Sequence, residues 1–365
     1  KKNAGNTMSQ PLSFIAGSRA LRIIRDEGLN PDRISVVAGA AGGPKWLILG
    51  GIDRCMGEFF KHRKKPLYLL GSSIGTWRFA ALAQNNSAAA IDAFEKAYLN
   101  QSYSAAPTTG EVTSVSRDIL DAYLPDIRKS EILRHPYYRL NILSVRSRHI
   151  LALESRAAIA AGMALATITN LVSRKSMGLH FERILFSDGR DRPPFHNLKG
   201  FPIHHVPLGE ENLKQAVMAS GSIPMVMEGV NDIPGTPAGT YRDGGMIDYH
   251  IDISFDPDPD HIVLYPHYTD SIIPGWLDKH LPWRRAHKKN MDNVLMVCPS
   301  KEFIAALPHG KIPDRNDFMK FKGRDQERLE YWRKAVQGAK LLGEEFQEAV
   351  AAKKISSMTV EYGKQ

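Results

Sequence analysis

Short apolar runs alternate with longer amphipathic stretches through most of the chain. Residues 34–38 are short and rich in β-branched side chains, which predicts a buried strand, and residues 66–70 form a second such run. A glycine-rich turn follows each run, and residues 45–60 and the stretch ending at Leu82 then predict helices. Later strand-like runs are residues 140–145, 183–186, 262–265 and 294–298. This alternation predicts an α/β fold with a mostly parallel sheet covered on both faces.

Two further segments have helical patterns. The C-terminal segment is expected to form an amphipathic helix docked on the sheet layer, with the apolar positions Leu329, Trp332, Val336, Ala339, Phe346 and Val350. Residues 157–173 are the longest uncharged stretch, which is shorter than the ~20 apolar residues of a membrane-spanning helix. We expect a buried core helix there, and a lid or interfacial helix is the alternative.

The length of 365 residues allows one large α/β domain or two smaller ones. Because no Ser- or Gly-rich linker divides the chain, we expect a single domain over residues 8–365, with a variable segment at 248–324 and a C-terminal helix. Residues 1–7 are polar and precede Met8, and we expect them to be an expression remnant outside the native fold.

Charge and cysteine content indicate the binding partners and the cellular compartment of the protein. The net charge of +9 favours encounters with anionic surfaces. Since the chain has no zinc-finger spacing, RNP-type motif or long basic helix, we expect no nucleic-acid partner. Cys55 and Cys298 lie among apolar neighbours and are expected to be buried free thiols. We therefore expect a cytoplasmic protein that can contact an anionic membrane peripherally.

The strongest chemical signal follows the strand at residues 66–70. Gly71-Ser72-Ser73-Ile74-Gly75 matches G-x-S-x-G between a strand and a helix, which is the setting of a nucleophile elbow. The spacing makes Ser73 the candidate nucleophile. A side chain at Gly71 or Gly75 would crowd so sharp a turn. Taken alone, the motif also fits an ordinary turn.

Two other glycine motifs supply the remaining chemistry. Gly42-Gly43-Pro44-Lys45 links the first strand to a helix, where glycines let backbone N–H groups approach an oxyanion closely. Because Pro44 has no N–H, the expected donors are Gly42 and Gly43. Downstream, Asp243-Gly244-Gly245 provides a candidate carboxylate. Either motif alone also fits a simple connection.

Together these motifs resemble those of the patatin-like phospholipases. That family carries a Gly-Gly-x-Arg/Lys loop, a G-x-S-x-G elbow, an Ala-Ser-x-x-x-Pro segment (here residues 219–224) and an Asp-Gly-Gly/Ala triplet, in this order. The resemblance covers residues 34–247. It implies a three-layer α/β/α sandwich and a lipid acyl hydrolase that acts on phospholipids or other acyl-ester lipids, and we expect no cofactor and no metal.

The resemblance also implies roles for single residues. Ser73 attacks the ester carbonyl to form an acyl-enzyme, and Asp243 accepts the proton and passes it to the leaving group. Gly42 and Gly43 hold the oxyanion. Lys45, Gly71, Gly75, Gly244 and Gly245 support the site. Because a carboxylate is a weaker base than imidazole, such a dyad needs direct Ser–Asp contact and is expected to work at lower pH than a histidine triad.

Alternative functions stay open at this level. An α/β-hydrolase triad would use a histidine downstream of Asp243, and the candidates are His250, His261, His267, His280, His287 and His309. A non-catalytic lipid-binding relative would keep the fold alone. The alternating carboxylates of Asp256, Asp258 and Asp260 lack the glycine and glutamate of a calcium loop, so we expect a solvated loop there.

Residues 272–289 combine tryptophans with basic residues. Trp276, Trp283, Arg284 and Arg285 suit a lipid interface, where indole rings sit at headgroup depth and cations meet anionic lipid. We expect this segment to rim the acyl pocket and dock on membrane. A packed loop beside a solvated charged face is the alternative.

Overall fold

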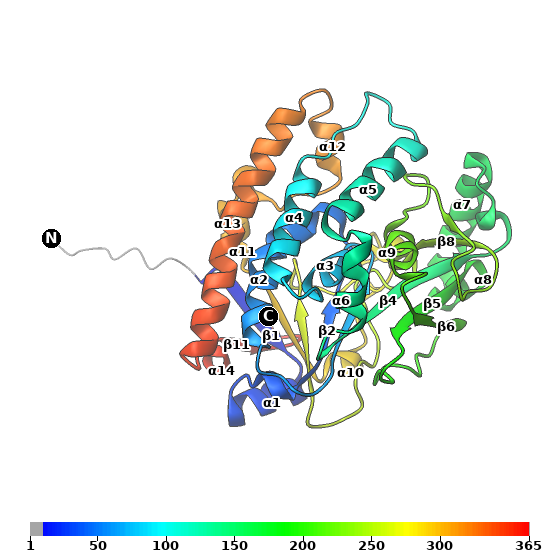
Figure 1. Ribbon diagram of the computed structural model, residues 1–365. Coiled ribbons are helices and arrows are strands. Elements are labelled where there is room, and N and C mark those ends of the chain that lie inside the picture. The colour runs from blue at the N-terminus through cyan, green and yellow to red at the C-terminus, as the bar shows by residue number, and fades with distance from the viewer. Residues whose placement is uncertain (1–9, 365) are drawn as a thin grey trace.

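A mixed β-sheet runs through the protein, and five parallel strands form its centre (Figure 1). The computed structural model describes residues 10–364. In spatial order the central strands are β10 (Val294–Pro299), β9 (Ile262–Pro266), β2 (Ile34–Gly39), β3 (Leu67–Ser72) and β4 (Tyr138–Ser147). The expected remnant at residues 1–7 lies outside the described residues.

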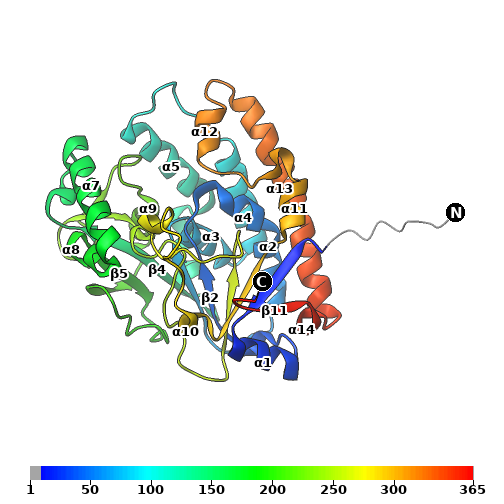
Figure 2. The same cartoon turned by 180° about the vertical axis from the view of Figure 1, so that it is seen from behind.

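Shorter strands complete both edges of the sheet. Beyond β10 lie β1 (Leu12–Ala16), which is antiparallel to it, and β11 (Thr359–Glu361), seen from behind in Figure 2. Beyond β4 lie β5 (Phe181–Asp188), which is antiparallel to it, and β6 (Ile203–Leu208). The last residues of β4 also pair with β8 (Thr240–Asp243), which pairs in turn with β7 (Val230–Asn231).

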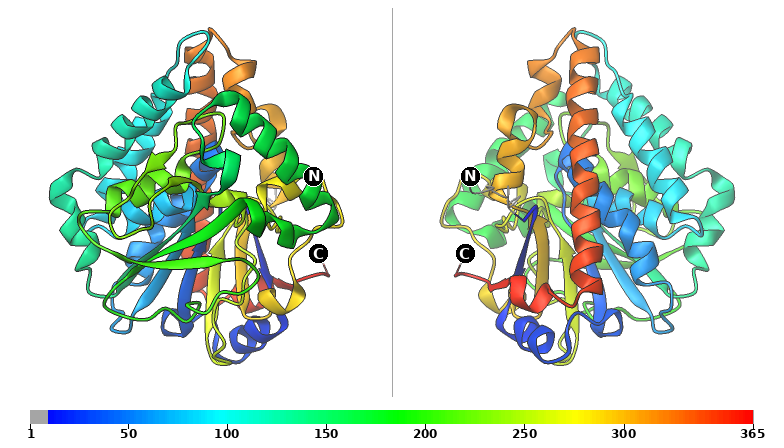
Figure 3. Two further views of the ribbon diagram at one scale, coloured as in Figure 1. Left: turned by 90° about the vertical axis from the view of Figure 1, so that its right-hand side faces the viewer. Right: turned by 90° about the vertical axis from the view of Figure 1, so that its left-hand side faces the viewer.

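Helices cover both faces of the sheet, which gives a three-layer α/β/α sandwich. Figure 3 shows α4 (Ser87–Leu99) and α5 (Thr109–Tyr123) on one side and α7 (Arg156–Val172) and α10 (Lys288–Met291) on the other. The first side also carries α2 (Gly50–Phe59) and α3 (Ile74–Leu82), and α13 (Asp325–Ala351) packs on α2. The remaining helices are α1 (Ser18–Glu27), α6 (Lys129–Leu133), α8 (Met177–His180), α9 (Leu213–Gly221), α11 (Lys301–Ala306), α12 (Asn316–Lys320) and α14 (Ile355–Met358).

The six strands predicted from apolar runs are confirmed, and so is the C-terminal helix. Every residue of β2 and of β10 is buried, as expected for parallel strands covered on both faces. The helix predicted over residues 45–60 is divided. A 3₁₀ helix, η2 (Gly43–Leu49), precedes α2, and α2 packs so closely on α13 that a Cβ at Gly51 would lie 2.3 Å from the Ala339 carbonyl oxygen.

The prediction of a buried core helix over residues 157–173 is wrong. Helix α7 buries only Ile159, Gly162, Ala166 and Asn170. Apart from the partly buried Met163, its other large apolar side chains are exposed, and Ile168 and Val172 are 62% and 87% exposed. The uncharged sequence therefore reflects a surface rather than the core, in line with the interfacial alternative. Within residues 10–364, no helix combines the length and apolar character needed to span a bilayer.

Cys55 and Cys298 are buried free thiols, as predicted, and burial raises their pKa values to about 11 and about 12.

The expectation of a solvated loop over Asp256, Asp258 and Asp260 is wrong for Asp256. Its carboxylate is buried and hydrogen-bonded to Ser35 Oγ at 2.5 Å and to His261 Nδ1 at 2.9 Å. Asp258 and Asp260 are exposed.

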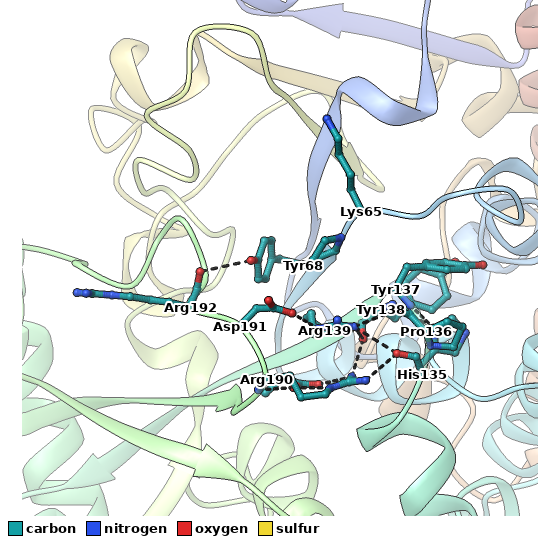
Figure 4. A network of polar contacts seen from close by, with 12 residues as sticks. Lys65, Tyr68, His135, Pro136, Tyr137, Tyr138, Arg139, Arg190, Asp191 and Arg192 are labelled. Atoms are coloured by element: carbon teal, nitrogen blue, oxygen red, sulfur yellow. Dashed lines mark hydrogen bonds and ion pairs between the residues drawn. The ribbon is translucent and has the colours of Figure 1, made fainter.

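A polar network ties the start of β4 to the loop after β5 (Figure 4). Arg139 pairs with Asp191 at 2.5 Å, and Arg190 donates a hydrogen bond to the His135 carbonyl oxygen at 2.8 Å. Burial lowers the pKa of His135 to about 4, so the imidazole is neutral at pH 7. The network fixes the end of the sheet at which the parallel strands begin. The candidate site lies at the other end, beside the carboxyl ends of these strands.

Candidate active site

Ser73 occupies a strained turn between β3 and α3. Its φ of 54° and ψ of −127° are unfavourable for a residue with a side chain, so the surrounding packing has to hold it in place. The flanking glycines allow this packing. A Cβ at Gly75 would lie 2.1 Å from the Gly39 carbonyl oxygen, and a Cβ at Gly71 would lie 2.5 Å from the Thr76 backbone.

Asp243 reaches the serine from the end of β8. The antiparallel register places Asp243 opposite Ser144 on β4, next to the carboxyl end of β3. Ser73 Oγ donates a hydrogen bond of 2.6 Å to Asp243 Oδ2, and the Gly245 amide donates one of 2.7 Å to Oδ1. A Cβ at Gly244 would lie 2.3 Å from the Leu143 carbonyl oxygen, so this position has no room for a side chain.

Burial shapes the electrostatics of the carboxylate. Asp243 is 5% exposed, and this burial raises its pKa above the ordinary value. The Arg315 guanidinium and the hydrogen bond from Ser73 act in the opposite direction, and Lys279 adds to their effect. Asp243 is therefore more basic than a solvated aspartate.

The 219–224 segment braces both members of this pair. The Ser73 amide donates to Ser220 Oγ at 2.9 Å, and Ser220 Oγ donates to the Leu143 carbonyl oxygen at 2.7 Å. The Asp243 amide donates to the Ser222 carbonyl oxygen at 2.9 Å. Since the Ser73 N–H is already bonded, it does not point freely at a substrate.

The Gly42-Gly43 loop places two backbone N–H groups at the start of a helix, and Gly43 lies in the same cavity wall as the serine. Gly42 is the N-cap of η2 and Gly43 its first residue, and N–H groups at these positions have no acceptor within the helix. Gly43 has a φ of 56°, which favours glycine, and it lines the same cavity as Ser73. The structure thus brings Gly43 to the nucleophile, and Gly42 immediately precedes it.

A buried tyrosine and histidine hold this loop from behind. Tyr268 donates a hydrogen bond of 2.6 Å to the Ala41 carbonyl oxygen, and its ring would be 2.6 Å from a Cβ at Gly42. His250 Nδ1 accepts the Ile273 amide at 3.0 Å, so Nε2 carries the proton and donates to the Tyr268 oxygen at 2.6 Å. Burial lowers the pKa of His250 far below its usual value, so the ring stays neutral.

Three of the six candidate histidines of the alternative triad have other hydrogen-bond partners. His250 bonds to Tyr268, His261 to Asp256, and His267 to the Thr269 carbonyl oxygen. Over residues 10–364, the Ser73 hydroxyl is hydrogen-bonded to a carboxylate and not to an imidazole. The geometry therefore favours a dyad over a histidine triad.

An apolar cavity of about 320 Å³ opens beside Ser73. Ser73 and Gly43 lie in its wall together with the apolar side chains of Ile74, Trp77, Tyr98, Val112, Ile119 and Phe318. The polar Nε1 of Trp77 is bonded to the Val217 carbonyl oxygen at 2.9 Å and does not interrupt the apolar surface. A second recess of about 10 Å³ lies beside Asp243, between Tyr249, Trp276 and Arg315.

Three cationic side chains gather around the serine and aspartate. Arg315 lines both cavities, and its Nε would lie 3.0 Å from a Cβ at Gly43. Lys45 Nζ is 4.8 Å from the Tyr268 ring centre, and Lys279 Nζ is 4.1 Å from that of Tyr249. Sequence reasoning identified Lys45 but missed the other two cations, because no motif marks them in the 248–324 segment.

The chain shares low sequence identity with solved structures of other proteins. No protein-family model and no curated protein matched the sequence. Similar solved structures include VipD from Legionella pneumophila (12% identity, TM-score 0.32) and human GIVD cytosolic phospholipase A2 (11%, 0.38). They match 65% and 93% of this chain, which spans 50% and 63% of their respective lengths. Similarity of this degree determines neither the family nor the activity of the chain.

The four residues expected at a membrane lie in three different environments. Trp276 is half-buried and faces the recess beside Asp243. Trp283 is 66% exposed, and Arg285 is exposed next to it. Arg284 lies between them and α7, where its Nη2 donates to the Asn170 carbonyl oxygen at 2.8 Å. The segment therefore joins the reaction centre to the exposed face of α7.

Proposed function

We propose that this protein is a serine lipid acyl hydrolase that uses Ser73 as nucleophile and Asp243 as base. One observation carries the proposal: a 2.6 Å hydrogen bond joins the Ser73 hydroxyl, on a strained elbow, to a buried carboxylate. Nucleophile–base pairs of this kind generate covalent acyl-enzymes. The apolar cavity at Ser73 suits the acyl part of a phospholipid or another acyl-ester lipid.

Acylation follows from the positions of the groups. As Ser73 Oγ attacks the ester carbonyl, its proton passes to Asp243 Oδ2, and the carbonyl oxygen gains negative charge. The free Gly42 and Gly43 amides stabilise that charge. Collapse of the tetrahedral intermediate breaks the ester C–O bond, and the proton on Asp243 passes to the departing alkoxide. The acyl group is then bound to Ser73 as an ester.

Deacylation needs a water molecule at the same carboxylate. The recess beside Asp243 has a volume of about 10 Å³, which is roughly the space needed for one water. Water in this recess would give a proton to Asp243 and attack the acyl-enzyme, and the carboxyl would then return the proton to Ser73. The Gly245 amide holds Oδ1 in place through both steps.

We also propose that the exposed face of α7 docks on an anionic membrane at the cytoplasmic side. Leu165, Ile168, Leu171 and Val172 are exposed there, and Trp283 lies on the neighbouring segment. The exposed cations Lys175 and Arg285 flank these apolar side chains. Apolar and indole groups beside cations match the interface of an anionic bilayer.

Covalent labelling tests the proposed chemistry. A fluorophosphonate probe should label the native protein and the Ser72→Ala variant, which loses the neighbouring hydroxyl of the same motif, but not the Ser73→Ala variant. Asp243→Asn should lower kcat on a short-chain ester by about 10²–10⁴-fold, because it removes the base. Labelling that survives in Ser73→Ala, or full activity in Asp243→Asn, would refute the dyad.

A further inference from the structure

The cations around Ser73 and Asp243 have no acidic partners of their own. Among residues 10–364, the charged groups of Lys45, Lys279 and Arg315 form no ion pair. Asp314, the acidic neighbour of Lys45, shares Lys311 with Asp317, at 2.9 and 2.7 Å. With Lys311 included, four cations therefore face the three carboxylates of Asp243, Asp314 and Asp317, and the site keeps an excess of positive charge.

Arg315 lies where a substrate has to pass. It borders the acyl cavity on one side and the small recess beside Asp243 on the other, and it lies against Gly43 of the Gly42-Gly43 loop. Lys279 extends the positive surface outward, between the ring faces of Tyr249 and Trp276 at 4.1 and 5.2 Å. Cations thus line the path from the ester carbonyl toward solvent.

Unpaired cations in a partly dehydrated site repel one another. Loss of surrounding water and the nearby charges of Arg315 and Lys45 lower the pKa of Lys279 to about 7, although the residue is exposed at the rim. The pKa of Lys45 is also lowered, mainly by burial. A bound anion would relieve this repulsion. The planar guanidinium of Arg315 matches the oxygens of a phosphate.

We propose that Arg315, Lys45 and Lys279 form a subsite for the phosphate of a phospholipid headgroup, next to the scissile ester. This inference rests on the proposed hydrolase function and refines its substrate. With the acyl chain in the apolar cavity and the carbonyl at Ser73, the alcohol part of the ester has to leave past Arg315 toward Lys279. Acyl glycerols that carry a phosphate therefore bind more tightly than neutral ones.

Binding to an inactive protein tests the subsite without turnover. Calorimetry with Ser73→Ala compares soluble dihexanoyl phosphatidylglycerol with neutral dihexanoylglycerol. Adding Arg315→Gln or Lys279→Gln should weaken binding of the phosphate lipid by about 10- to 100-fold, the range for a hydrogen bond to a charged group. Binding of the neutral lipid should change far less. Arg315→Lys and Lys279→Arg, which keep the charge, should recover part of the affinity.

Two comparisons make the result decisive. Lys340→Gln removes an exposed positive charge from α13 and should leave the binding of both lipids unchanged. Inorganic phosphate should bind at least about 10-fold more weakly than the phosphate lipid, because it lacks the acyl contacts. Equal losses for both lipids in Arg315→Gln, or inorganic phosphate that binds as tightly as the lipid, would overturn the subsite.

The inference and the proposed function can fail separately. Ser73 labelling and hydrolysis of the neutral lipid without any preference for the phosphate lipid would leave the hydrolase standing and remove the subsite. Selective phosphate-lipid binding by a protein that neither labels at Ser73 nor cleaves esters would keep the subsite and remove the hydrolase.

Discussion

At Ser73, backbone strain and chemistry occur in the same residue. The unfavourable φ and ψ angles are maintained because Gly71 and Gly75 let the backbone approach its neighbours and because Ser220 holds the Ser73 amide. The hydroxyl is then fixed in contact with Asp243 before any substrate binds. The geometry needed for proton transfer is thus prepared in the free protein.

The raised pKa of Asp243 predicts the pH dependence of the reaction. Because the carboxylate has to be ionised to act as a base, kcat/KM should fall as the pH drops through this raised value. Arg315 lowers the pKa of Asp243, so Arg315→Gln should move the acidic limb to higher pH. A pH–rate profile on a neutral short-chain ester measures this, with Lys340→Gln as the charge control. A limb that stays in place would show that Arg315 does not act on the carboxylate.

Lys279 should also make substrate binding depend on pH. Its pKa of about 7 means that it loses its charge as the pH rises through neutrality, so KM for dihexanoyl phosphatidylglycerol should rise above pH 7. Arg315, Lys45 and Asp243 are the charged groups that affect this pKa, and Asp278 beside it is paired with Arg174. Lys279→Arg should abolish the rise, since arginine stays charged. A KM that rises equally in Lys279→Arg would exclude Lys279 as its origin.

We expect Tyr268 to position the Gly42-Gly43 loop for catalysis. Tyr268→Phe removes the hydrogen bond to the Ala41 carbonyl oxygen, so the loop becomes less fixed and kcat should fall by about 10-fold, less than after loss of an oxyanion donor itself. KM should change little, because the residue does not touch the acyl cavity. Tyr265→Phe, which removes a buried hydroxyl from β9, is the matched control. Equal loss of thermal stability and activity in both variants would indicate a purely structural role.

The sequence anticipated Ser73 and Gly43 because each lies in a glycine motif that follows a predicted strand. Asp243 was anticipated from its motif and from the motif order that resembles the patatin-like phospholipases, because no strand was predicted before it. The antiparallel pairing of β8 with β4, which brings Asp243 to Ser73, does not follow from strand–helix alternation. Arg315, Lys279 and Tyr268 could not be found this way, because loops without periodicity bring them to the site. The exposure of α7 was also missed, because an uncharged helix has the same composition in a core and at an interface.

Among the elements, the position of α3, the helix that follows the Ser73 turn, depends on a buried ion pair. Arg78 on α3 forms two hydrogen bonds, of 2.7 and 2.6 Å, with Asp53 on α2, and both side chains are 1% exposed. Helix α3 begins directly after Ser73, so this pair connects the nucleophile to the helix layer above the sheet. Helix α2 is in turn packed on α13.

Breaking this pair should destabilise the protein strongly. Asp53→Ala leaves a guanidinium buried without its partner, which costs about 3–5 kcal/mol of unfolding free energy. Chemical denaturation measures the loss. The double variant Asp53→Leu with Arg78→Met removes both charges and should recover much of the stability. A loss below about 1 kcal/mol in Asp53→Ala, the size typical of an exposed pair, would show that water reaches the site.

For the whole molecule, the exposed apolar face of α7 predicts how activity depends on a lipid surface. Ile168→Ser and Trp283→Ser should lower activity on vesicles that contain anionic lipid much more than activity on a soluble short-chain ester. Added salt should weaken binding to the vesicles, because screening acts on the flanking cations. Vesicle sedimentation and the two activity assays test this, and Leu341→Ser on α13 is a control at another exposed apolar position. Equal losses on vesicles and soluble ester would refute docking through α7.

The position of the recess beside Asp243, bordered by Tyr249, Trp276 and Arg315, also sets the order in which the two products leave. Asp243 gives its proton to the departing alcohol and later takes one from water, so water reaches the carboxylate only after the alcohol has gone. The alcohol is therefore the first product released and the fatty acid the second. An added alcohol that returns to this position before water does would take the acyl group itself, so the yield of methyl ester in methanol-containing solutions measures how well water competes there.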